Sequence, residues 1–274
     1  MRTFREAFAE FHATPQNQDL ARETKRIYER AFGELTLISE ADFDSLTSTE
    51  VRAAVAHLSD RPGLYNQALS TGSAMVSAVG TGDANPFTRI RKMKLGERKA
   101  WTDRELTRFV AGCDTGIVEP DVSMLFHLGL HTGQRVGDLM ELRWSDFTDN
   151  FSWLSLSQNK TGMEVTIPVH SRLKAVIEKH VRSMEAIPIG RVVTAKHTTL
   201  MAHFRKAMTA CDVRDRTFHG LRKTAARLMA EAGCTEREIM SITGHKSTAM
   251  ASYYTRQADR TRMAASAMKK LEAA

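Results

Sequence analysis

Several basic side chains in the second part of the chain are spaced so that they could act together on a phosphate. Arg135 follows Thr132 and Gly133 at the expected start of a helix. Asp138 lies three residues further on, and hence on the same helical face. A guanidinium held by a carboxylate keeps its planar fork oriented, which suits two phosphate oxygens. The same spacing also fits an ordinary surface ion pair.

A histidine and a second arginine share one turn of a later helix. His219 and Arg222 lie in the stretch "HGLRKTAA", three positions apart. This spacing puts imidazole and guanidinium on one face, where one could move a proton and the other bind a phosphate oxygen. His203 and Lys206 show the same spacing, so the pattern alone is common in a basic chain.

Two further groups stand at turns. Lys160 lies in "QNKTG", between two alternating stretches that predict a β-hairpin. An ammonium there could protonate a leaving alkoxide, although a solvated turn lysine is the ordinary reading. His245 follows Gly244, where a helix is expected to end, and a histidine there could simply interact with the helix dipole.

Tyr253 and Tyr254 are adjacent on an expected helix. Neighbouring helical residues point about 100° apart, so at most one of them can face a given site. A phenol can act as a nucleophile when positive charge or a base helps to remove its proton. Helical periodicity does not choose between the two tyrosines.

The elements that must position these residues are mostly helices. Capping boxes are predicted from Thr47, Thr102 and Thr235, each with a glutamate three residues later. Gly233 and Gly244 are placed to end helices, and a separate short helix is expected to carry the tyrosines before a terminal helix, "RTRMAASAMKKLEAA". The predicted fold is mainly α with a small antiparallel sheet. Residues 1–95 form a helical bundle, with a basic linker from about residue 88, and residues 96–274 form the second domain.

Composition narrows the class of protein. The chain has 274 residues and a net charge of +7; residues 1–95 carry 12 basic and 12 acidic side chains, so the whole excess lies in 96–274. A basic excess favours a polyanionic partner such as nucleic acid. No apolar run reaches the roughly 18 residues that a membrane span needs, and the charged N-terminus does not resemble a signal peptide. The three scattered cysteines predict neither a disulfide framework nor a zinc site.

Taken in order, these motifs resemble the tyrosine recombinases of the phage-integrase type. The resemblance rests on "HTGQRVGDLMELRWSDF", "NKTG" with the following "TIPVH", "FHGLRKTAARLMAEAG", "EIMSITGHKS" and "YTR". It covers about residues 96–260, whereas residues 1–95 are only compatible with the variable N-terminal domains of that family. Gln134 is a mild departure, because many members have an apolar residue there.

The resemblance implies a set of roles for the site. Arg135 and Arg222 would bind the phosphate, and Asp138 would support the site. Lys160 would protonate the leaving 5′ oxygen, His219 would assist proton transfer, and His245 would hydrogen-bond the phosphate. The nucleophile would be Tyr254, nine residues after His245, and Tyr253 would be a packing neighbour.

The resemblance also implies an activity and partners. The expected enzyme is a site-specific recombinase that cleaves and rejoins DNA through a covalent 3′-phosphotyrosyl intermediate, with no cofactor and no metal. Its N-terminal domain would clamp duplex DNA. The protein would act as a homotetramer on paired sites, with DNA-bending accessory proteins as candidate partners. It would act in the cytoplasm and at the nucleoid of a bacterial or phage system. A type IB topoisomerase and a DNA-binding regulator without catalysis are the alternatives.

Overall fold

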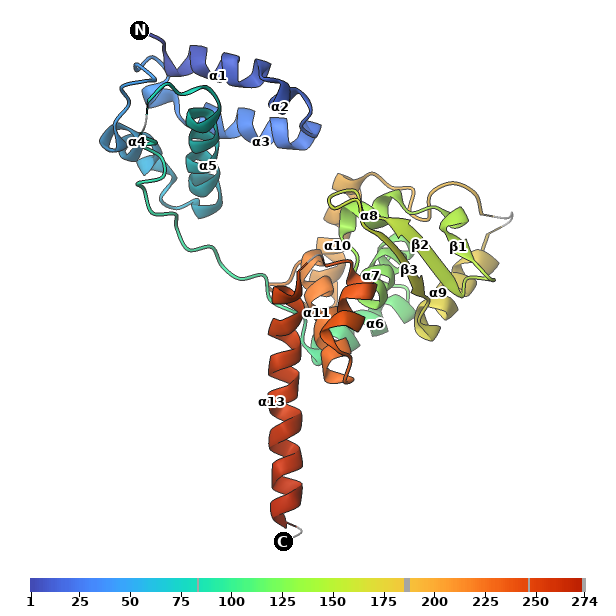
Figure 1. Cartoon of the computed structure of the whole chain (residues 1–274). Coiled ribbons are helices and arrows are strands. Elements are labelled where there is room, and N and C mark those ends of the chain that lie inside the picture. The colour runs from blue at the N-terminus through green and yellow to red at the C-terminus, as the bar shows by residue number, and fades with distance from the viewer. Residues whose placement is uncertain (83, 185–187, 246, 273–274) are drawn as a thin grey trace. The chain divides into compact units, whose positions relative to one another are not determined.

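Threonine caps begin the helices for which the sequence predicts them. The hydroxyls of Thr47, Thr102 and Thr235 each accept a hydrogen bond from the backbone N–H of the glutamate three residues later, whose carboxylate accepts one in return. These caps start α4 (Ser48–Val55), α6 (Asp103–Asp114) and α12 (Glu236–Thr243) (Figure 1). The three predicted capping boxes are confirmed.

The computed structural model describes residues 1–82, 84–184, 188–245 and 247–272. Its contacts divide the chain into two units, Met1–Glu97 and Arg98–Ala274. Each unit has its own hydrophobic core, so the two are described separately.

All the regular secondary structure described in the first unit is helical. Its remaining elements are α1 (Phe4–Ala13), α2 (Pro15–Gln18), α3 (Arg22–Gly33), α5 (Pro62–Val79) and the short turns η1 (Thr36–Ile38) and η2 (Ala56–Leu58). Helices α1 and α3 both pack on α5. Phe4 is fully buried and lies between the rings of Phe32, Phe43 and Phe87. The aromatic face of α1 therefore forms the centre of this core.

The start of the basic linker is bound to the first unit. The Phe87 ring fills the space beside Gly72 on α5, where any side chain would overlap it. The Asn66 amide exchanges two hydrogen bonds of 2.8 Å with the backbone of Met93. Residues 91–100 then continue without regular structure. The expected linker is thus anchored to α5 over its first part.

The second unit is built around α7 (Pro120–Thr132). This helix contacts α8 (Val136–Glu141), α9 (Ser171–Arg182), α10 (His197–Ala210) and α11 (Phe218–Glu231). Residues on most of its surface are buried, which explains why its sequence, "PDVSMLFHLGLHT", is apolar on all sides. Trp101, Phe109, Phe126 and Phe204 form the aromatic part of the core, with ring centroids 4.5–6.0 Å apart.

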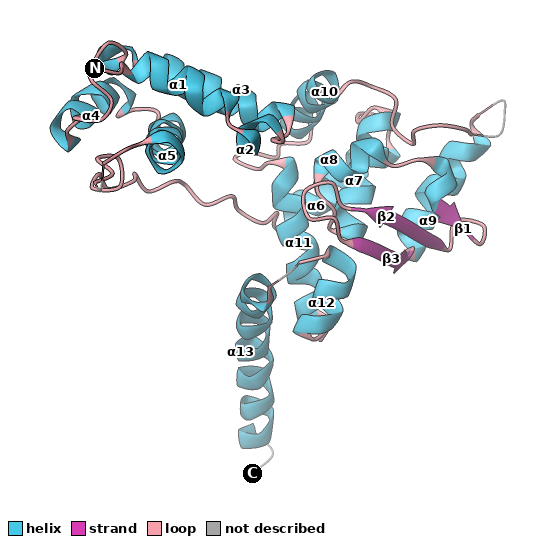
Figure 2. Cartoon of the chain, turned by 45° about the horizontal axis from the view of Figure 1, so that its top comes forward, coloured by secondary structure: helices cyan, strands magenta, loops and turns pink. Residues whose placement is uncertain are grey.

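The sheet is small and antiparallel, with strand order β1-β2-β3 (Figure 2). Strands β2 (Trp153–Ser157) and β3 (Glu164–Pro168) form the predicted hairpin, with Leu154 opposite Ile167. Strand β1 (Phe147–Thr148) follows the turn η3 (Trp144–Asp146). The sequence does not predict this strand, because two residues are too few to show an alternation of apolar and polar side chains. A mainly α fold with a small antiparallel sheet is confirmed.

The C-terminal region corrects one prediction. The tyrosine helix and the terminal helix are a single helix, α13 (Thr248–Glu272). No glycine or proline interrupts this segment, and alanine, lysine and arginine favour helix, so nothing local ends it after the tyrosines. Within the described ranges, no helix combines the length and apolar character that a bilayer crossing needs.

Three stacked histidine rings lead from the interior of the second unit to its surface: His127 is buried, His131 half-buried and His170 exposed. The ring of His131 lies 5.8 Å from that of His127 and 4.6 Å from that of His170. Burial, reinforced for His131 by these neighbours and Arg172, lowers the pKa of His127 to about 4 and that of His131 to about 3. The folded protein therefore holds both rings neutral at pH values where the unfolded chain binds protons.

We expect the free energy of unfolding to rise with pH between about 4 and 6.5, because the unfolded chain binds more protons there. Each such histidine contributes up to about 1.4 kcal/mol per pH unit. His131→Leu should flatten this slope. Tryptophan fluorescence during urea unfolding measures it, because Trp101, Trp144 and Trp153 all lie in the second unit. The control is His197→Leu, at an exposed histidine; equal slopes for H131L and the parent would contradict the account.

Candidate active site

Arg222 is a buried cation with an unused donor. It lies on α11 and is only 5% exposed. Its Nη1 donates to the Gly133 carbonyl at 2.6 Å, and its Nε donates to His245 Nε2 at 3.2 Å. Its Nη2 is buried, with no hydrogen-bond partner in the described part of the chain. A buried donor left unpaired is costly and rare, so this nitrogen marks a position for an acceptor from outside the protein.

The charge around Arg222 is mostly positive. Desolvation and the neighbouring Arg135 lower the pKa of Arg222 to about 10, while Asp138 and Tyr254 oppose that shift. Arg222 therefore still carries its charge at neutral pH. Two guanidinium groups that repel each other in a partly desolvated site are stabilised by an anion placed between them.

His245 is a neutral acceptor that orients Arg222. The Thr243 hydroxyl donates to the Ile239 carbonyl at 2.7 Å, so it accepts at 2.8 Å from Nδ1–H of His245. This tautomer leaves Nε2 with a lone pair for Arg222. Burial, followed by the charges of Arg222 and Arg135, lowers the pKa of His245 to about 4. Both of its nitrogens are therefore engaged with the protein.

Arg135 and Asp138 lie together, as their spacing predicts. Arg135 is the N-cap residue of α8, and its Nη1 lies 3.7 Å from Asp138 Oδ2. The Asp138 side chain is 3% exposed, and its other oxygen accepts a hydrogen bond of 2.9 Å from the Asn159 backbone. Asp138 thus ties Arg135 to the β2–β3 hairpin. This arrangement differs from an exposed surface pair.

Lys160 stands apart from the other predicted residues. It is exposed in the turn between β2 and β3, and among the described residues its side chain forms no hydrogen bond or ion pair with theirs. Its backbone neighbour Asn159 is held by Asp138, so the turn is anchored beside Arg135. The structure therefore places the loop at the site but leaves the lysine side chain in solvent.

His219 is exposed on the first turn of α11, one turn before Arg222. Partial desolvation lowers its pKa, and the positive charges of Arg98, Arg222, Lys223 and Arg135 add to this effect. A lowered pKa keeps the imidazole neutral at neutral pH, so it can accept a proton.

The two tyrosines differ clearly in their surroundings. Tyr254 is 7% exposed and packs with Ala226, Ala230 and Ile239 of α11 and α12, whereas Tyr253 is 53% exposed. The phenol of Tyr254 is close enough to act electrostatically on Arg222. Tyr253 packs its ring against that of Tyr254 in a T-shaped arrangement, with 5.3 Å between the ring centroids.

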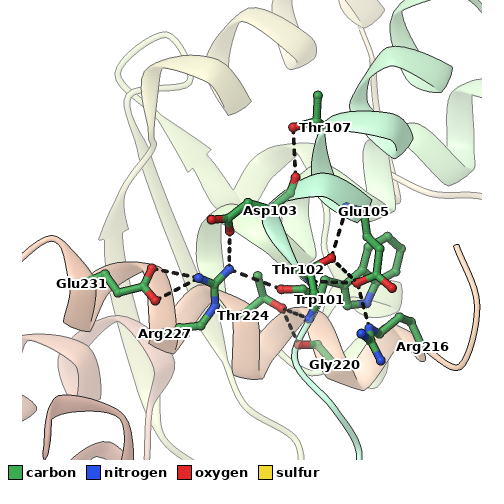
Figure 3. A network of polar contacts seen from close by, with 10 residues as sticks. All are labelled: Trp101, Thr102, Asp103, Glu105, Thr107, Arg216, Gly220, Thr224, Arg227 and Glu231. Carbon is green, nitrogen blue, oxygen red and sulfur yellow. Dashed lines mark hydrogen bonds and ion pairs between the residues drawn. The ribbon is translucent and has the colours of Figure 1, made fainter. Parts of the chain in front are cut away.

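The chain segment before α6 holds α11 in place. Trp101 donates from its backbone to the Thr224 hydroxyl at 2.8 Å (Figure 3). Its indole donates to the Thr217 carbonyl at 3.1 Å. On the far part of α11, Arg227 binds both Asp103 and Glu231. These contacts secure both ends of the helix that carries His219 and Arg222.

A second pair anchors the approach to α11. Glu105 and Arg216 form an ion pair of 2.9 Å with side chains 11% and 12% exposed (Figure 3). Although burial opposes it, hydrogen bonds from Thr102 and Arg216 lower the pKa of Glu105. The charged pair therefore fixes the loop before α11 against the start of α6.

Sequence reasoning missed two buried glutamines and a threonine at this site. Gln134 and Gln158 are 1% and 0% exposed and bond to each other, and Thr243 is fully buried under His245. Gln134 stood out only as a polar residue at an often apolar position. Since the pair joins residues 24 positions apart, no local pattern signals it. In the described residues, no group of three or more histidine, cysteine or acidic side chains is placed to hold a metal ion.

Comparison with known proteins agrees with this geometry. The profile of the phage integrase family matches residues 100–261, more than half of the chain. The chain belongs to the phage integrase family.

Individual relatives within this family are distant. The integrase of Enterobacteria phage 434 is 27% identical over 238 residues, which cover 79% of this chain and 65% of the relative. The integrase of Escherichia phage HK022 is 33% identical over 141 residues, covering 46% of this chain and 39% of the relative. The chain thus spans less than two thirds of the length of these relatives.

Solved structures share the fold. A lambda integrase dimer bound to a COC′ core site superposes with a TM-score of 0.75 at 23% identity, covering 90% of this chain and 97% of that one. A lambda integrase tetramer bound to a Holliday junction gives a TM-score of 0.76 at 23% identity, covering 92% and 77%. At such identities the likeness establishes the fold of this chain.

Gly244 is required where α12 turns toward His245. Its φ is +67°, and a Cβ there would overlap the Gln158 amide. We expect Gly244→Ala to lower the free energy of unfolding by about 2–4 kcal/mol, combining backbone strain and overlap. The control, Gly116→Ala, has a φ of +77° but open space around it, and should cost about 1 kcal/mol. Equal losses in urea unfolding would contradict this reading.

Proposed function

We propose that the protein is a site-specific DNA recombinase that cleaves and rejoins strands through a 3′-phosphotyrosyl intermediate. The observation that carries the proposal is the buried Arg222, whose Nη2 has no partner among the described residues and which lies beside a second guanidinium. A phosphodiester supplies the missing acceptor and the negative charge together. Membership in the phage integrase family supports the same assignment.

In the proposed reaction, the Tyr254 oxygen attacks phosphorus, a Tyr–O–P bond forms and the P–O5′ bond breaks. His219, kept neutral by its lowered pKa, takes the phenol proton. Lys160 moves in from solvent to protonate the leaving 5′ oxygen. Attack by a 5′-hydroxyl of another strand reverses these steps, so the bond energy of the phosphodiester is conserved.

The arginines act on the phosphate itself. Arg135 and Arg222 bind the non-bridging oxygens and neutralise the charge that grows on them during attack. Asp138 holds Arg135. His245 acts through Arg222, since its Nε2 accepts from that guanidinium; it donates to the phosphate only after a change of tautomer.

We further propose a division of labour between domains and copies. Residues 1–95 clamp duplex DNA together with the basic linker, and residues 96–274 catalyse. Four copies act on paired sites, as the lambda integrase tetramer bound to a Holliday junction suggests by analogy of fold. Exposed Met263, Met268 and Leu271 on α13 suit a contact with a neighbouring copy. A role for DNA-bending accessory proteins rests on the resemblance alone.

Tyr254→Phe should abolish covalent protein–DNA adducts while DNA binding survives, because only the nucleophilic oxygen is lost. The substrate is a pool of randomised duplexes, nicked so that the cleaved end diffuses away and the adduct is trapped. Adducts are counted on a denaturing gel, and the trapped DNA is sequenced to give the site. The control is Tyr253→Phe, which should form adducts. An adduct with Y254F, or its loss only with Y253F, would contradict the assignment.

Arg222→Lys should slow cleavage of the selected duplex about 10²–10³-fold, because a lysine keeps the charge but loses the oriented donors. The measurement is single-turnover adduct formation at saturating protein. Arg182→Lys, on an exposed arginine of α9, is the matched control and should cleave at the parent rate. Parent-like cleavage by R222K would remove Arg222 from the phosphate site.

A further inference from the structure

Two buried amides join three segments of the active site. Gln158 directly follows β2 at the hairpin turn, and Gln134 lies between α7 and α8. Gln158 Nε2 donates to Gln134 Oε1 at 2.6 Å and to the Thr243 carbonyl at 2.8 Å. Gln134 Nε2 in turn donates to the Ile242 carbonyl at 2.6 Å. The pair thus connects the hairpin, the start of α8 and the end of α12.

The orientation of the Gln158 amide is fixed by its partners. A carbonyl can only accept, so the amide nitrogen must face Thr243, and a guanidinium can only donate, so the amide oxygen must face Arg135. That oxygen accepts from Arg135 Nη1 at 2.8 Å and from the Thr161 hydroxyl at 2.8 Å. Two donated and two accepted bonds use the full capacity of the side chain, and a flipped amide would lose all four.

Gln158 makes a closer contact with Arg135 than Asp138 does. The distance from Arg135 Nη1 is 2.8 Å to the Gln158 oxygen and 3.7 Å to Asp138 Oδ2. Asp138 balances charge, whereas the neutral amide fixes direction and leaves the positive charge of the guanidinium available. The Arg135 side chain is 25% exposed and Arg135 is the N-cap residue of a helix of only six residues, so its guanidinium needs such a support.

We propose that Gln158, held in place by Gln134, is a positioning residue that aims the Arg135 guanidinium at the scissile phosphate. The pair also connects Arg135 to the end of α12. That end directly precedes His245, which accepts a hydrogen bond from Arg222. This proposal rests on the proposed function, because it assigns Arg135 to the phosphate.

The test uses Gln158→Met and Gln134→Met in the full chain, on the duplex selected from the nicked pool. Methionine keeps the length of the side chain and removes its amide. Q158M should form adducts about 10- to 100-fold more slowly at saturating protein, and Q134M should be slower in the same direction. Ile177→Ala is the control for an effect of lower stability alone, because Ile177 is fully buried on α9. This variant should cleave at the parent rate.

A second measurement separates positioning from general damage. Replacing one non-bridging oxygen of the selected phosphate by methyl removes the charge that Arg135 neutralises. The rate defect of Q158M should therefore shrink at least fivefold on this methylphosphonate, as should the defect of Arg135→Ala. Tryptophan fluorescence confirms that each variant is folded at the assay temperature; if Q158M is unfolded, Q134M carries both measurements.

Each outcome has a distinct meaning. Parent-like cleavage by the glutamine variants, or an equal defect on the phosphate and the methylphosphonate, overturns the positioning role. Failure of the parent protein to form any adduct would instead overturn the proposed function.

Discussion

The second unit is organised around the cost of burying one cation. Arg222 is 5% exposed, lies beside a second guanidinium and, within the part of the chain that the structure describes, retains an unpaired donor. The protein reduces this cost with neutral groups: the Gly133 carbonyl and the unprotonated nitrogen of His245 accept from it, and neither cancels its charge. A carboxylate in their place would stabilise the fold better and leave less attraction for a phosphate. The site is therefore prepared for an anion.

This constraint explains how the surrounding elements are fixed. Helix α11 is held at both ends, by Trp101 on Thr217 and Thr224 and by the ion pairs of Arg227, so Arg222 cannot retreat toward solvent without breaking them. Helix α12 ends at a left-handed Gly244, which brings His245 to the guanidinium. The amide pair fastens that turn to the hairpin. Polar contacts across the chain, more than the hydrophobic core, set the geometry of the site.

Local rules predicted much of this fold. Capping boxes, the glycine stops and the alternating hairpin each depend on residues within a few positions of one another, and all were found where the sequence placed them. The break expected in α13 was wrong, because no local signal ended the helix. The glutamine pair and the burial of Tyr254 rather than Tyr253 depend on contacts between distant segments. Periodicity could not choose between the tyrosines, and only the resemblance to a family selected Tyr254.

The central claim is that the two arginines hold a phosphodiester where the Tyr254 oxygen can attack it. The most direct measurement is mass spectrometry of the trapped adduct, after digestion of both protein and DNA. The account predicts one modified peptide, with a nucleotide joined to Tyr254 through its 3′ phosphate. A nucleotide on Tyr253 or any other residue, or a linkage through a 5′ phosphate, would contradict it.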